Sequence, residues 1–91
     1  MSVAIRIPTQ LRTLTGGTGE VYVEADNVGS ALKELDANYP GFGARIFDEA
    51  GKLRRFVNVF LNDEDIRFLN GPDTSVEKGQ TISIVPAVAG G

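Results

Sequence analysis

The stretch NVGSALKELDANYPG, residues 27–41, decides the fold, because its apolar residues follow the 3.6-residue period of an α-helix. They recur three and four positions apart and form one stripe, made of Val28, Ala31, Leu32, Leu35 and Tyr39. Asn27 is suited to cap the start by accepting a hydrogen bond from a free backbone N–H, and Pro40-Gly41 predicts the end. We therefore expect one amphipathic helix that covers one face of a sheet.

The segments around this helix show the two-residue alternation of β-strands. We expect strands, in chain order, at residues 3–7, 20–24, 56–61, 66–69 and 81–85. The glycine-rich segment 15–19 is typical of a hairpin loop, since several of its positions accept a positive φ. Between residues 41 and 55 the pattern is weak and predicts one short helical turn and a loop.

This order of elements predicts an α+β fold. If the first and last strands pair in parallel at the centre, their long connection leaves room for the helix to cross the sheet. The expected architecture is the ubiquitin-like β-grasp, a mixed sheet of four to five strands with one main helix across one face. Residues 1–86 would form this domain, and residues 87–91 a flexible tail.

Composition excludes several classes of function. The chain has 91 residues, enough for one domain, and contains neither cysteine nor histidine. It therefore lacks thiolate metal ligands, disulfides and the usual general base, and we expect no metal site. Nine basic and twelve acidic side chains give a net charge of −3, which argues against nucleic-acid binding. With neither a signal-peptide pattern nor a long apolar run, we expect a cytoplasmic protein with no membrane partner.

The last six residues, PAVAGG at 86–91, carry the chemistry. They contain no charged or large side chain, whereas chain ends are usually polar. Pro86 has no N–H to donate and is expected to release the chain from the sheet. The extended tail would reach roughly 20 Å. The α-carboxylate of Gly91 is then the reactive group, and small residues would let it enter a narrow active site.

The order of elements, the helix stripe, the segment RFVNVFLNDEDIRF at 55–68 and the ending VPAVAGG at 85–91 resemble the ThiS/MoaD group of ubiquitin-like sulfur carriers. The resemblance covers nearly the whole chain, and residues 55–68 are most similar to carriers of a cysteine-biosynthesis route. It implies that the chain is not an enzyme. An E1-like adenylyltransferase/sulfurtransferase would use ATP to convert Gly91 to a thiocarboxylate, and the chain itself would bind no cofactor.

The resemblance also implies the later partners, a PLP-dependent cysteine synthase and a metalloprotease that releases the product. Three alternatives stay open. Within the same class, the chain could be the small subunit of molybdopterin synthase or a thiamine sulfur carrier. It could instead be a ubiquitin-like modifier conjugated to other proteins through Gly91, or a binding module whose tail plugs a partner.

The alternation of side chains along the strands predicts a docking surface on the side of the sheet away from the helix. If the odd-numbered residues of the strand at 56–61 face the helix, Phe60 faces away, and Val85 joins it from the last strand. Phe60 and Val85, together with Val88, Ala89 and Gly90 of the tail, are the expected partner-binding residues. The alternative is that Phe60 is covered by the preceding loop. The basic cluster at 52–55 could likewise meet an acidic partner or a substrate phosphate, or be a charged loop edge.

Overall fold

The computed structural model describes residues 2–55 and 57–86. The strands are β1 (Ser2–Arg6), β2 (Glu20–Glu24), β3 (Val57–Leu61), β4 (Glu64–Asp65) and β5 (Thr81–Pro86). The α-helices are α1 (Val28–Asn38) and α2 (Phe42–Ile46), and the 3-10 helices are η1 (Thr9–Thr15), η2 (Ile66–Phe68) and η3 (Gly71–Asp73).

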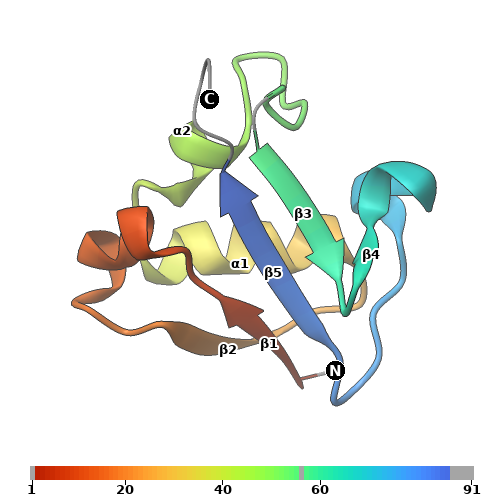
Figure 1. Ribbon diagram of the computed structural model, residues 1–91, viewed down its shortest axis with the longest axis horizontal. Coiled ribbons are helices and arrows are strands. Elements are labelled where there is room, and N and C mark those ends of the chain that lie inside the picture. Colours follow the sequence, from red (N-terminus) through yellow and green to blue (C-terminus); the bar gives the residue numbers. More distant parts are fainter. Residues whose placement is uncertain (1, 56, 87–91) are drawn as a thin grey trace.

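The strands of the described residues form one mixed sheet in the order β2-β1-β5-β3-β4. β1 pairs in parallel with β5, with Ile5 opposite Ile82, and the other neighbours are antiparallel. Helix α1 crosses one face of this sheet, and the last strand lies at its centre (Figure 1). The predicted β-grasp, with its central parallel pair, is confirmed.

Helix α1 begins as the sequence predicts. The Asn27 side chain accepts a hydrogen bond from the Ser30 N–H at 2.7 Å, and the Ser30 hydroxyl accepts one from the Asn27 N–H at 3.3 Å. This reciprocal capping box satisfies two backbone donors that the first turn leaves free. The apolar stripe is buried beneath the helix, with Val28, Ala31 and Leu35 each 0% exposed.

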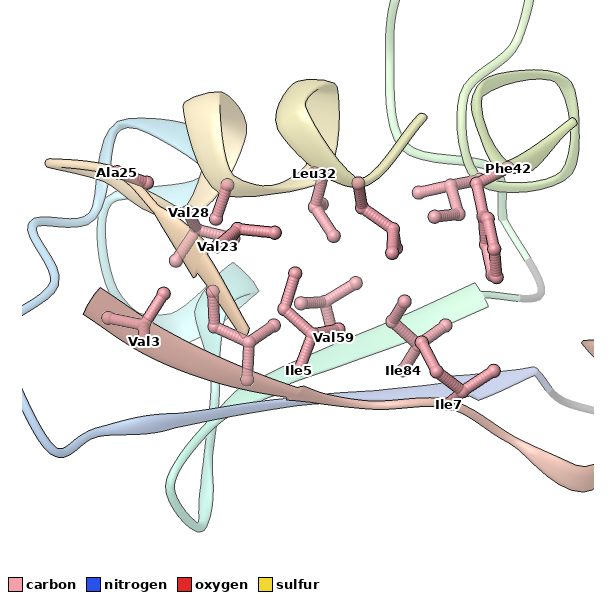
Figure 2. Packing of buried hydrophobic residues seen from close by; sticks show 14 of the residues in the cluster. Val3, Ile5, Ile7, Val23, Ala25, Val28, Leu32, Phe42, Val59 and Ile84 are labelled. Carbon is pink, nitrogen blue, oxygen red and sulfur yellow. The ribbon is translucent and has the colours of Figure 1, made fainter. Parts of the chain in front are cut away.

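The core lies between α1 and one face of the sheet. Figure 2 shows Ile5, Val59 and Ile84 of three adjacent strands pointing toward Leu32 of the helix, with Phe42 of α2 closing one end. Because successive strand residues point to opposite faces, alternate positions of β1, β3 and β5 supply this core. The other positions are left for the outer face of the sheet.

The edge strand expected at residues 66–69 is wrong. The pairing strand β4 is only Glu64–Asp65, and the chain then turns into η2. The Asp65 carboxylate accepts a hydrogen bond from the Arg67 N–H at 2.8 Å and so caps a helical turn. The turn places Ile66 in the core, where it is 0% exposed. A local cap and one buried side chain therefore outweigh the weak strand pattern.

Two further details differ from the sequence-based expectation. Pro86 does not leave the sheet, because it is still paired with Val57 at the end of β5. A proline is tolerated at a strand end, where its carbonyl can still accept a hydrogen bond. The second difference is helix η1, which was not expected. The hairpin turn is therefore limited to the glycine-rich residues that follow this helix. Two of them, Gly16 and Gly17, have positive φ angles of 67° and 96°.

Replacing Leu35 by alanine should lower the free energy of unfolding by about 2–5 kcal/mol, since it leaves a cavity under α1. Urea denaturation followed by circular dichroism measures the change. Glu34→Ala, on the exposed side of the same helix, is the matched control and should stay within about 0.5 kcal/mol of the native chain. Equal effects of the two substitutions would contradict the packing described above.

Candidate functional site

The predicted reactive end lies outside the described residues. This applies to Gly91 and Gly90, and also to Ala89 and Val88. The structure does show the point from which these residues continue, the end of β5 at Val85–Pro86, which we call the tail root. In Figure 1 the tail root lies beside the start of β3 and near α2, at one end of the molecule.

The tail root is held mainly from one side. On the β3 side, Val85 is opposite Asn58 and Pro86 is opposite Val57. On the β1 side the pairing ends earlier, at Arg6 opposite Ser83. The last residues of β5 therefore depend on β3 for their position in the sheet.

The two predicted docking residues lie on the outer face of the sheet, near each other. Phe60 is opposite Ser83, and Asn58 is opposite Val85, so Phe60 and Val85 are diagonal neighbours. Such neighbours have Cα atoms roughly 7–8 Å apart. Val85 exposes 44% of its surface, and Phe60 is half-buried. The parity prediction for both residues agrees with the structure, whereas Phe56, the first residue of the strand expected at 56–61, lies outside the described residues.

Arg67 forms hydrogen bonds with several acceptors at and before the start of β3. Its guanidinium donates hydrogen bonds to the Asn58 side-chain oxygen at 2.7 Å, to the Val57 carbonyl at 2.8 Å and to the Arg54 carbonyl at 2.9 Å. β4 is too short to cover this part of β3, because its two residues pair only with Phe60 and Leu61. Arg67 thus satisfies acceptors along an open strand edge and fixes the strand on which the tail root depends.

A hollow of about 300 Å³ lies next to the tail root. Its lining is mostly apolar and comes from η1, α2, β3 and β5, namely Gln10, Leu11, Arg45, Ile46, Val57, Ile84 and Pro86. The hollow opens where β5 extends beyond its pairing with β1. The chain therefore leaves the sheet beside a shaped apolar surface.

The outer face farther from the tail root is more polar. Tyr22 of β2 is 68% exposed, and its hydroxyl donates a hydrogen bond to the Glu20 carboxylate at 2.8 Å. This bond and the negative charge of Glu20 raise the pKa of Tyr22 above its ordinary value of 10.0, because both disfavour the phenolate. The apolar part of the outer face is thus concentrated on β3 and β5.

Sequence reasoning missed Arg67 and the exposed Phe68. Arg67 binds acceptors nine to thirteen positions away, and no local pattern signals such contacts. Phe68, which falls in the expected edge strand at residues 66–69, lies in the helical turn η2 and is 88% exposed. Only the turn signal of Asp65 could have indicated that residues 66–68 form a helical turn rather than a strand.

Other kinds of site are not found in the part of the chain that the structure describes. Within residues 2–55 and 57–86, no three acidic side chains come together in a way that could hold a metal ion. None of the helices formed by these residues is long and apolar enough to cross a membrane.

A β-grasp domain whose central last strand ends beside an apolar patch of the outer face defines a class, the ubiquitin-like carriers and modifiers. Comparison with known proteins narrows the class. The ThiS family model matches residues 5–91. The sulfur carrier protein CysO of Mycobacterium tuberculosis is 46% identical over 93 residues, covering 100% of both chains.

Two further relatives also match this chain over nearly its whole length. A chain in the crystal structure of the Amycolatopsis orientalis BexX/CysO complex superimposes with a TM-score of 0.91 at 44% identity, covering 98% of this chain and 99% of that one. The small archaeal modifier protein 3 of Haloferax volcanii is 31% identical, again over 100% of both chains. The chain therefore belongs to the ThiS family, and the prediction of a ubiquitin-like sulfur carrier is confirmed.

Arg67→Lys should destabilise the fold by about 1–3 kcal/mol, because an ammonium group cannot reach three acceptors arranged around a planar guanidinium. Chemical denaturation measures the loss, and faster amide hydrogen exchange in β3 would locate it. Arg45→Lys is the control, since the Arg45 side chain donates no hydrogen bond to a described residue. If both variants have the same unfolding midpoint as the native chain, Arg67 does not stabilise β3.

Proposed function

We propose that this chain carries sulfur as a thiocarboxylate at Gly91 and supplies it for cysteine biosynthesis. The observation that carries the proposal is the full-length similarity to the sulfur carrier protein CysO, which reaches the two terminal glycines. The absence of cysteine and histidine fits a protein that holds a reacting group while its partners catalyse.

The chemistry explains why a carboxylate must be activated. A carboxylate is a poor electrophile, so its oxygen first attacks the α-phosphorus of ATP and pyrophosphate leaves. The resulting acyl adenylate has AMP as a good leaving group. A sulfur nucleophile then attacks the carbonyl carbon and displaces AMP. The product is a thiocarboxylate at Gly91. In this proposal an E1-like adenylyltransferase/sulfurtransferase binds the ATP, and this chain binds no cofactor of its own.

The thiocarboxylate is useful because sulfur is more polarisable than oxygen and a better nucleophile at neutral pH. In the proposed route a PLP-dependent cysteine synthase presents an aminoacrylate, and the thiocarboxylate sulfur adds to its β-carbon. An acyl shift to the amino group follows, and a metalloprotease hydrolyses the new amide bond to free cysteine and the carrier. The BexX/CysO complex supports the view that a carrier of this shape works with a protein partner. We place the reaction in the cytoplasm, where ATP is available.

The position of the tail root in the described structure supports this role. The tail root belongs to the central strand, which is paired on both sides over its first residues and carries the buried Ile82 and Ile84. The body can therefore present its last residues from a fixed point. A partner that recognises Phe60 and Val85 would receive the tail in a defined direction.

Incubation with the activating enzyme of the same organism, ATP and a sulfur donor should add the mass of an oxygen-to-sulfur exchange to the carboxyl end. Mass spectrometry of the intact protein and of its C-terminal peptide measures it. A chain lacking Gly90 and Gly91 keeps the whole described domain and should gain no mass. Absence of the exchange in the native chain, or its presence in the shortened one, would overturn the proposal.

One observation favours a second function, conjugation to other proteins. The Haloferax relative is named a modifier protein and matches over its full length. A modifier would form isopeptide bonds between Gly91 and lysine side chains of targets. Mass spectrometry of cellular proteins would test this. Lysine side chains that carry a Gly-Gly remnant, together with the absence of the thiocarboxylate form of this chain, would favour conjugation over sulfur transfer.

Val85→Ser should weaken binding to the activating enzyme by about 1–2 kcal/mol, because it removes an exposed apolar contact next to the tail root. Tyr22→Ser changes the same outer face at β2 and is the matched control, expected to bind as the native chain does. Isothermal titration calorimetry measures both affinities. Equal losses, or none in either variant, would show that the apolar patch is not the docking surface.

A further inference from the structure

Four exposed arginines lie on α2, on η2 and just before β3, the elements next to the tail root. We call Arg45, Arg54, Arg55 and Arg67 the arginine collar. Arg45 lines the hollow together with Pro86. The Arg54 side chain donates a hydrogen bond to the Ala44 carbonyl of α2 at 2.9 Å, and Arg55 follows it toward the start of β3.

The collar is not neutralised by its surroundings. None of the four guanidinium groups forms an ion pair with a carboxylate of the described residues, whereas Arg6 and Glu20 form one at 3.9 Å. The nearby Asp48 carboxylate accepts hydrogen bonds from the backbone N–H groups of Ala50 and Lys52. Four of the nine basic side chains of a chain with net charge −3 are thus gathered at one end.

Among the described residues, the opposite end of β5 carries more acidic than basic side chains, with Asp63 and Glu77 against the single cation Lys78. Asn62 donates a backbone hydrogen bond to the Thr81 carbonyl at 2.7 Å and so brings Asp63 next to the start of β5. Glu77 lies in the same turn, since its carbonyl accepts a hydrogen bond from the Gln80 N–H at 3.1 Å. The charge distribution is therefore polarised along the central strand β5, with its positive end at the tail root.

We propose that the arginine collar is the docking surface for an acidic patch on the activating enzyme, placed around the opening that receives the tail. This rests on the proposed function. A polarised carrier is oriented by an acidic surface before contact, so that its tail arrives first. The hollow beside Arg45 accepts an apolar side chain from the same enzyme surface. The net negative charge of the chain disfavours nucleic acid as the partner of this surface.

Single charge reversals test the proposal. Arg45→Glu and Arg55→Glu change groups that donate no side-chain hydrogen bond to a described residue, so the fold should be kept. Lys78→Glu makes the same change in net charge at the far end of β5, roughly 20 Å away, and is the matched control. Stopped-flow measurement of association with the activating enzyme, at low and high ionic strength, compares them.

At low ionic strength each collar variant should associate about three- to tenfold more slowly than the Lys78→Glu variant. The difference should vanish near 1 M salt, where the screening length is about 3 Å. At saturating carrier the oxygen-to-sulfur exchange should proceed at the native rate, because the collar acts on docking and not on chemistry. Equal association rates for collar and control variants would overturn the proposal. A missing exchange in the native chain would instead count against the proposed function.

Discussion

The parallel pairing of β1 with β5 is the constraint on which the rest of the structure depends. It places the last strand between the first and the third, with Ile5 opposite Ile82 in the buried layer. Parallel neighbours cannot be joined by a tight turn, so the chain between them must cross the sheet, and α1 lies in that connection. The helix covers the inner face, and β5, the last strand, lies in the middle of the sheet.

The same strand serves the core and the functional site by alternation. Ile82 and Ile84 point inward and are at most 3% exposed, whereas Ser83 and Val85 point outward. One-residue displacement of β5 against its neighbours would exchange the two sets, burying polar groups and exposing isoleucines. The register that stabilises the core is therefore also the register that presents Val85 beside Phe60. In the proposed function, folding and partner binding therefore depend on alternate positions of one strand.

Much of this arrangement could be predicted from periodicity. The helix stripe of residues 28–39, the cap at Asn27 and the alternation in the main strands all reflect burial on one side, which leaves a local signal in the sequence. The inward and outward faces of β3 followed from parity alone. Helix η1 and the turn at Ile66–Phe68 could not be predicted in this way, because short 3-10 helices depend on single caps and single buried residues. The contacts of Arg67 are set by tertiary proximity, so the sequence contains no local trace of them.

The one-sided support of the tail root has a mechanical consequence. Hydrogen bonds between antiparallel strands run perpendicular to the strands, so tension applied to the carboxyl end acts along β5 and shears its bonds to β3 all at once. Unzipping bond by bond would require a sideways force. If a partner draws the tail along the direction of β5, as the proposed function requires, the force therefore falls on all of these bonds together and the body resists it.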